Sequence, residues 1–173
     1  MKRGLAALLL LAICTIACVA YAAETDVQAI PACEVCGMSR ETFASSRMLI
    51  RYADGTKVGT CSIRCAMEAL GAARGKKVAS VKVADYTTRV LLDADKAFWA
   101  IGGDEPGVMT RTPKWAFATK AAARAFIKEH GGRLASFAEA KQAAGAELTG
   151  MGKKKMKKGA KEKVKCNCCD MKK

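Results

Sequence analysis

Four cysteines in the body of the chain fall into two close pairs, and their spacing restricts the possible folds more than any other feature. Cys33 and Cys36 lie in CEVCGM, where Gly37 can adopt the positive φ of a tight turn that aims both sulfurs at one point. Cys61 and Cys65 lie on one face of a predicted helix whose N-terminal dipole favours thiolates. A CxxCG knuckle, a hairpin and a helix that begins with two cysteines form the layout of a treble-clef metal site. The sequence therefore predicts a metal centre made of thiolates.

The identity of the metal depends on the methionines as well as on the cysteines. Thioethers are poor zinc ligands and good Cu(I) ligands, because soft sulfur donors select soft ions. Met38 follows Cys36 by two residues, and Met109 stands in the loop EPGVMT, whereas Met67 fits the apolar face of a helix and is core filler. Two sets of ligands stay open: Cu(I) held by Cys33 and Cys36 and completed by Met38 or Met109, or structural zinc held by Cys33, Cys36, Cys61 and Cys65.

The body of the chain alternates between strand and helix patterns in two successive runs. The first run contains a hairpin turning at Asp54-Gly55, a helix and a strand, at residues 47–60, 61–75 and 76–86. The second run contains two strands, a helix, a strand and a short helix, at residues 97–103, 114–119, 120–132, 133–137 and 138–145, and residues 91–97 connect the runs. We therefore predict an α+β fold in which two small strand-strand-helix-strand units pack as one compact domain over residues 31–145.

The first 22 residues have the pattern of a secretory signal peptide. Lys2 and Arg3 precede an apolar run that ends in small residues, with a plausible cleavage site after Ala22. The run is also about 20 residues long, which a membrane-spanning helix needs, and Cys18 closes an imperfect lipoprotein box. We expect an exported, periplasmic protein, with lipid attachment at Cys18 and anchoring to a membrane as the alternative to simple cleavage.

The formal net charge of +14 comes mainly from the tail, residues 149–173. The tail holds ten lysines against Glu162 and Asp170, whereas residues 24–148 hold 18 basic and 14 acidic residues, a difference of only four. The excess is therefore not a basic face on a fold, and nucleic acid is not an expected partner. The tail lacks an apolar period and is predicted to be disordered, and its CNCCDM cluster can wrap a soft cation through Cys166, Cys168 and Cys169.

The sequence favours a binding protein over an enzyme. A thioredoxin-like redox site expects its first cysteine at the start of a helix after a strand, but Pro31 precedes Cys33 and Gly37 follows the pair. The one histidine of the chain, His130, stands at a predicted helix end and is explained by the helix dipole. No constellation of catalytic residues is therefore predicted.

The body also resembles a known family, the NosL proteins, which are exported accessory proteins of nitrous oxide reductase. The resemblance covers about residues 31–140 and is carried by CEVCGM, YADGT, VADYTTRVLLDADKAFWAIGG, GVMT, KWAFATKAAARAFIKEHGG and FAEA. It implies a copper-binding periplasmic lipoprotein with two strand-strand-helix-strand units related to the helper fold of organomercurial lyase. It also implies Cu(I) delivery to the copper-sulfur cluster of nitrous oxide reductase, with the client enzyme or its maturation machinery as partner. By position, Cys36 and Met38 match the family's Cys-Gly-Met, and Met109 matches the family's later loop methionine. Cys61, Cys65 and the tail lie outside the family pattern.

Overall fold

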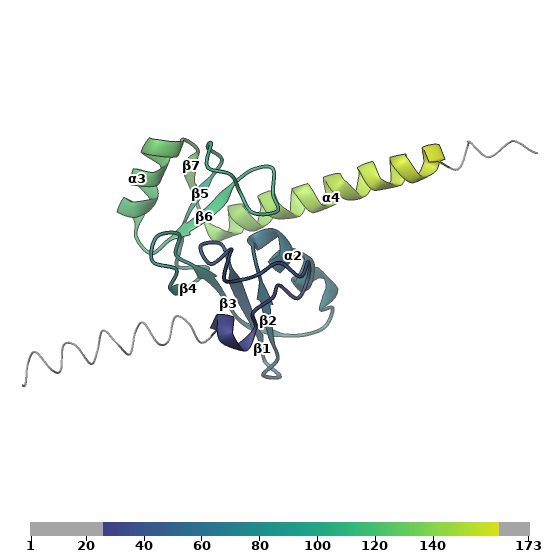
Figure 1. Cartoon of the computed structure of the whole chain (residues 1–173), viewed down its shortest axis with the longest axis horizontal. Helices are drawn as coiled ribbons and strands as arrows, with labels where there is room; N and C mark the ends of the chain where they lie inside the picture. Colours follow the sequence, from purple (N-terminus) through teal and green to yellow (C-terminus); the bar gives the residue numbers. More distant parts are fainter. Residues whose placement is uncertain (1–25, 163–173) are drawn as a thin grey trace, which may run out of the picture.

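A computed structural model describes the backbone of residues 26–162 and the side chains of residues 26–150 (Figure 1). One helical turn at residues 26–29 leads into the loop that carries the first cysteine pair. Two small antiparallel sheets follow, one in each half of the chain, and a long helix closes the sequence of elements. The predicted α+β class is confirmed.

The first sheet has the strand order β2-β1-β3-β4, and all its neighbouring strands are antiparallel. Its elements are β1 (Met48–Tyr52), β2 (Lys57–Thr60), α2 (Ile63–Ala72), β3 (Val78–Ala84) and β4 (Leu91–Asp93). The β1–β2 hairpin turns at the predicted residues: Gly55 has a φ of +85°, and the Asp54 carboxylate accepts a hydrogen bond from the Thr56 N–H at 2.9 Å. In β1, residues 48, 50 and 52 are buried, the period of two that packs one face of a strand on a core.

The second sheet repeats the arrangement of the first. Its elements are β5 (Phe98–Ile101), β6 (Lys114–Phe117), α3 (Lys120–His130) and β7 (Arg133–Ala135), and the strand order is β6-β5-β7. In both sheets the first strand lies in the middle, its hairpin partner lies on one side, and the strand after the helix lies on the other. The two predicted strand-strand-helix-strand units are therefore confirmed.

One prediction between the two units is wrong. Residues 91–97 were expected only to connect the halves, but Leu91–Asp93 form β4, which pairs with the far edge of β3. The two leucines at its start favour this pairing, because their side chains are half-buried against the sheet. Ala94 and Ala97, in the turn after β4, are buried in the core.

A shared hydrophobic core makes the two units one domain. Residues of β1, α2, β3, β5, β6 and the last helix contribute to it, and Met67 packs against it, as expected of core filler. The ring of Trp99 stacks on Phe137 with 5.5 Å between centroids, and its indole N–H donates to the carbonyl of Ala94 at 3.1 Å. Burying such aromatic pairs stabilises the fold by about 0.5–1.5 kcal/mol beyond their area.

The last helix, α4 (Phe137–Glu162), is much longer than the helix predicted over residues 138–145. It packs against α2 near its start and then projects away from the body (Figure 1). The helix thus extends into residues 149–162, the start of the lysine-rich segment. Alanine, glutamate, lysine and methionine are strong helix formers, which favours a helical backbone in this segment. Among the helices of the described residues, none is long and apolar enough to cross a membrane.

Candidate metal centre

The first cysteine pair is held in a short, hydrogen-bonded knuckle. The Cys33 N–H donates to the carbonyl of Met38 at 2.8 Å, the Gly37 N–H donates to the carbonyl of Cys33 at 2.8 Å, and Ala32 forms a bridge with Ser39. Gly37 has a φ of +76°, the left-handed conformation that the sequence predicted for this turn. The knuckle therefore fixes the backbone on both sides of the two thiols.

The second cysteine pair lies where β2 passes into α2. Cys61 follows the end of β2, and Cys65 lies in the first turn of α2. Ser62 occupies the N-cap position, and its side chain accepts no capping hydrogen bond. The hydroxyl of Ser46 donates to the carbonyl of Cys61 at 2.7 Å and ties this junction to the segment after the knuckle.

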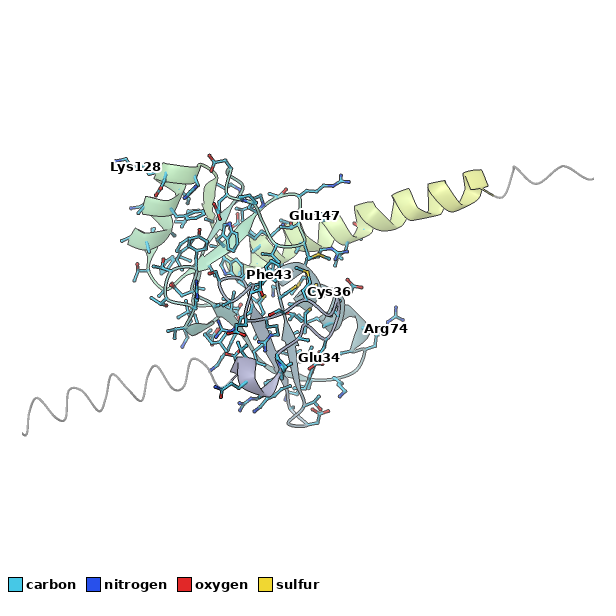
Figure 2. The ribbon with its side chains drawn as sticks, in the orientation of Figure 1. Glu34, Cys36, Phe43, Arg74, Lys128 and Glu147 are labelled. Carbon is cyan, nitrogen blue, oxygen red and sulfur yellow. The ribbon has the colours of Figure 1, made fainter. Side chains whose placement is uncertain are left out.

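The two pairs converge on one point. All four Sγ atoms lie within 4.8 Å of one another; Cys36 Sγ and Cys61 Sγ are 3.5 Å apart, and Cys61 Sγ and Cys65 Sγ are 3.8 Å apart. Ligands about 2.3 Å from a tetrahedral metal are about 3.8 Å from each other, so the four thiols have nearly the spacing of a closed four-sulfur site. Cys33, Cys61 and Cys65 are buried, Cys36 is half-buried, and sulfur atoms are visible beside Cys36 in Figure 2.

The thiols of the cluster differ in acidity. The pKa of Cys65 is lowered to about 6, chiefly because its sulfur accepts a hydrogen bond from the Cys61 thiol, while burial opposes the shift. The same hydrogen bond, and then burial, raise the pKa of Cys61, and burial raises the pKa of Cys36. Cys65, at the positive end of the α2 dipole, is therefore the thiol of the cluster that ionises most readily.

A buried arginine joins the backbone segments that carry the two cysteine pairs. The side chain of Arg40 is fully buried; it donates to Asp26 Oδ2 at 2.7 Å, to the carbonyls of Ile30 and Met48 at 2.7 and 3.1 Å, and to that of Thr60 at 3.3 Å. Thr60 directly precedes Cys61, and Arg40 itself follows the knuckle. The guanidinium therefore fixes the knuckle and the β2–α2 junction relative to each other.

A second arginine completes this network. Arg47 donates to both carboxylate oxygens of Asp26 at 2.8–3.2 Å, so the one carboxylate bridges two buried guanidinium groups. Gly59 lies beside the guanidinium group of Arg40. A Cβ at residue 59 would lie 2.8 Å from the guanidinium carbon, so a larger residue there would displace the arginine. Sequence reasoning missed Asp26, Arg40 and Arg47. Arg40, in MSRET, has the sequence context of an ordinary surface residue. The one signal in the sequence was Gly59, in VGTC, since a glycine in a strand can mark a place where another group comes close to the backbone.

A sequence model of the NosL family matches residues 24–144, which are most of the chain. The chain belongs to the NosL family. The matched region includes both cysteine pairs, Asp26 and the two buried arginines, and it ends before the lysine-rich tail. No curated protein matches the sequence.

Two solved NosL structures are similar to this chain. The crystal structure of the copper chaperone NosL from Shewanella denitrificans aligns with a TM-score of 0.50 and 22% identity, covering 62% of this chain and 87% of that one. The solution NMR structure of the apo-NosL protein from Achromobacter cycloclastes aligns with a TM-score of 0.36 and 22% identity, covering 53% of this chain and 82% of that one. At this level of identity the first alignment confirms the NosL fold.

The two methionines of the NosL pattern differ in their exposure. Met38 is half-buried and packs against the cysteine cluster. Met109 is 39% exposed with a φ of +56°, while its neighbour Val108 packs against the cluster. The structure thus brings Met38 to the thiols and leaves Met109 on the loop beside them.

The remaining predicted ligands lie outside the described residues. Residues 1–25 and 163–173 are not described, so the structure does not place Cys18 or the tail cysteines Cys166, Cys168 and Cys169. Among the described residues, the side chains that lie close enough together to hold a metal ion are those of the four cysteines of the cluster.

Proposed function

We propose that this NosL-family protein is an exported metallochaperone, not an enzyme, that binds Cu(I) at the cysteine cluster and passes it to a client copper protein. One observation carries the proposal: four free thiols converge within 4.8 Å and one of them, Cys36, is half-exposed. The similarity in fold to a copper chaperone of the same family supports it.

The unequal burial of the sulfurs suits a cargo site. Soft thiolates favour Cu(I), and Met38 adds a soft thioether at the edge of the cluster. A sulfur of the partner can reach the ion on the side of Cys36 and displace that ligand first, while the buried thiols still hold the ion. Met109 lies on the neighbouring loop, from which it can complete the site once metal enters.

Zinc is the second candidate, because the sulfur-to-sulfur distances match a closed tetrahedral site. In that case the cluster would stabilise the fold and the protein would act as an exported binding module. The two candidates make opposite predictions about exchange: a cargo ion leaves readily for a partner thiol, and a structural ion does not.

The place of action and the client are part of the same proposal. The leader predicts export to the periplasm, with Cys18 as a site of lipid attachment to a membrane. A client such as nitrous oxide reductase, or its maturation machinery, is the expected receiver. The tail cysteines can gather the metal before transfer.

The test is metal analysis of protein purified anaerobically from its own host, followed by Cu(I) competition against a chromophoric chelator. A variant with Cys166, Cys168 and Cys169 changed to serine isolates the centre in the body from the tail. We expect one tightly bound Cu(I) per variant chain and additional, weaker copper on the parent protein. One zinc that is held tightly, with no copper, would support the second candidate instead.

A further inference from the structure

One end of the first unit carries as much excess positive charge as the whole body. There the β1–β2 turn lies beside the connection from α2 to β3, since the Ala53 N–H donates to the carbonyl of Lys77 at 2.8 Å. We refer to residues 51–57 and 73–77 as the basic end, in which Asp54 is the one acidic residue. Residues 24–148 hold 18 basic and 14 acidic residues, so 13 of each sign remain outside the basic end. A count over the whole body hides the five exposed cations that gather here: Arg51, Lys57, Arg74, Lys76 and Lys77.

Two of these cations lie directly opposite each other. Arg51 of β1 and Lys57 of β2 are partners in the strand register, and both side chains are exposed. Among the residues that the structure describes, neither side chain has an ion pair, whereas Lys76 pairs with Asp54 at 3.1 Å. Like charges that face each other across two strands destabilise a sheet. The fold itself therefore does not explain why two cations stand at these positions.

An apolar side chain lies among the cations. Val78, the first residue of β3, follows Lys77 and is 40% exposed; in the described part of the chain, the other large hydrophobic side chain exposed to this degree is Met109. Ala53 and Ala79 beside it are exposed as well. Cations around an exposed apolar side chain suit the boundary between lipid headgroups and acyl chains, because the charges attract anionic headgroups while the apolar group enters the hydrocarbon.

The chain enters the body on the face of the first sheet that carries Arg51 and Lys57. A Cβ at Gly59 would lie 2.8 Å from Ile30 Cγ2, so the first residues of the body cover β2 on the face that Gly59 presents. Figure 1 shows the helical turn at residues 26–29 beside β1 and β2. Successive residues of a strand alternate between the two faces, so Lys57 and its partner Arg51 share the face of Gly59.

The length of chain before the body allows this face to meet a membrane. Arg40 donates both to Asp26 and to the carbonyl of Met48, which places the start of the body beside the start of β1. Arg51 lies three strand steps farther along, about 10 Å. Eight residue steps separate Asp26 from Cys18 and span at most about 29 Å, so a lipid on Cys18 and the basic end can reach one surface.

We propose that the basic end docks on an anionic lipid surface, with Arg51, Lys57 and Lys77 at the headgroups and Val78 at the edge of the hydrocarbon. A membrane explains both the unpaired charges and the exposed valine, whereas a purely acidic partner would use the charges alone. Each lysine or arginine near an anionic membrane strengthens binding about fivefold. The docking requires no metal, so it goes beyond the proposed copper transfer and stands apart from it.

Docking at this end would leave the cysteine cluster at the opposite end of α2. The strand β2 leads from Lys57 toward Cys61, and α2 returns from Cys65 to Ala72, just before the second segment of the basic end. Seven steps along an α-helix rise about 10 Å. The metal centre is therefore separated from the docking surface by the length of this helix.

Vesicle binding by a charge variant tests the docking. The unlipidated chain, residues 23–173, is floated with vesicles of phosphatidylcholine that contain phosphatidylglycerol, and its partition constant is measured. The triple variant Arg51→Gln, Lys57→Gln and Lys77→Gln keeps the lysine-rich tail and should bind at least about tenfold more weakly. Added salt should weaken binding of the parent, because exposed charges are screened. A parent chain that binds these vesicles no better than vesicles of phosphatidylcholine alone would overturn the proposal.

An equal loss of charge elsewhere provides the matched control. Lys120, Arg124 and Lys128 are exposed on α3 in the second unit, and Figure 2 shows Lys128 on the opposite side of the molecule from Arg74. Changing all three to glutamine gives a chain with the same net charge as the first variant. It should bind vesicles nearly as well as the parent. Equal weakening by the two triple variants would show that the tail or the net charge binds the lipid, and would refute docking at the basic end.

A fluorescent probe locates the contact directly. Val78→Trp and Ala125→Trp each add one exposed tryptophan, the second on α3, to a chain whose Trp99 and Trp115 are buried. Brominated lipids quench tryptophans that reach the hydrocarbon. We expect quenching on vesicle binding in Val78→Trp and hardly any in Ala125→Trp. Equal quenching of the two variants would contradict the proposed orientation.

Poly-glutamate separates a membrane from an acidic protein. Val78→Ser should weaken vesicle binding about threefold and leave binding of poly-glutamate unchanged, because only the membrane uses the apolar group. Binding of poly-glutamate that depends on Arg51, Lys57 and Lys77, with no quenching of Val78→Trp by brominated lipid, would identify an acidic protein surface as the partner and overturn the membrane proposal. All these measurements use metal-free protein, so their failure would leave the proposed metal transfer intact.

Discussion

Cys36 differs from the other thiols of the cluster by its greater exposure, which is the basis for proposing it as the exchangeable ligand. Cys36→Ser should weaken Cu(I) binding at least tenfold in competition with a chromophoric chelator, because the thiolate is replaced by a poor ligand for a soft ion. The metal-free protein should keep nearly the same melting temperature, because the side chain is half-exposed.

The same substitution distinguishes cargo from structural metal. A structural zinc site can supply about 10 kcal/mol or more of binding energy coupled to folding, so its disruption should loosen the domain. Circular dichroism of the metal-depleted parent provides the control. If the parent unfolds on metal removal, and Cys36→Ser unfolds with it, the cargo interpretation fails.

The two methionines near the cluster predict unequal effects on copper. Met38→Leu should weaken Cu(I) binding more than Met109→Leu, since Met38 packs against the thiols and Met109 is exposed. Leucine nearly conserves the apolar volume, so each change should cost less than about 1.5 kcal/mol of stability. Met67→Leu, in the core, is the matched control and should leave Cu(I) affinity unchanged. Equal affinity in all three variants would show that thiolates alone hold the ion.

At the scale of the elements, local signals were sufficient for much of the site. Gly37 and Gly55 both have a positive φ, a conformation that few residues other than glycine adopt. The knuckle and the Asp54-Gly55 hairpin could therefore be predicted from the sequence. The order of these elements allowed the two cysteine pairs to share one site but left open whether they do, and the structure brings them together. Their spacing could not decide which pair would be more exposed.

Non-local contacts explain what the sequence did not show. Arg40 is buried because carbonyls from several distant segments surround it, and no short pattern encodes such a set. The strand β4 has three residues and forms only through pairing with β3, so its own pattern is too short to be recognised. The sequence of the outer part of α4 has strong helix formers but no apolar period, so a search for an apolar period does not detect it.

The contact between α4 and the loop before β6 gives a prediction about pH. Glu147 accepts hydrogen bonds from Thr110 at 2.6 Å and from the buried Lys114 at 2.9 Å. Burial alone would raise the pKa of Glu147, but these hydrogen bonds outweigh it and lower the pKa to about 2. The stabilisation is therefore complete above pH of about 4.5 and is lost as the pH falls through about 2.

Glu147→Gln should thus destabilise the protein at pH 7 by about 1–3 kcal/mol, because Lys114 is left buried without its counter-charge. Urea unfolding at several pH values measures the effect, and the difference from the parent should shrink toward pH 2. Glu139 is the matched control: its pKa is also about 2, but its ion pair with Arg133 is exposed, so Glu139→Gln should change stability little. A pH-independent loss in Glu147→Gln would contradict the charge argument.

At the scale of the whole molecule, the two units share a topology but contribute different residues to the cysteine cluster. The first unit and the knuckle before it hold all four thiols, whereas the second contributes Val108, which packs against the cysteine cluster. Residues of both units therefore surround the cysteine cluster. The shared core, which includes Trp99 and Phe137, holds the two units together.

The start of the folded body limits how the molecule can be attached to a membrane. Asp26, the first described residue, is fixed by Arg40 and Arg47, so only residues 19–25 would separate a lipid on Cys18 from the body. Eight residue steps span at most about 29 Å, so a lipidated protein would hold Asp26 within about that distance of the membrane surface. Mass spectrometry of the N-terminus from native membranes tests this arrangement. We expect export with removal of the leader, and a chain that begins with an acylated Cys18 would show anchoring. A soluble chain beginning at Ala23 would refute lipid attachment and leave export intact, whereas an uncleaved Met1 in the cytoplasmic fraction would refute both.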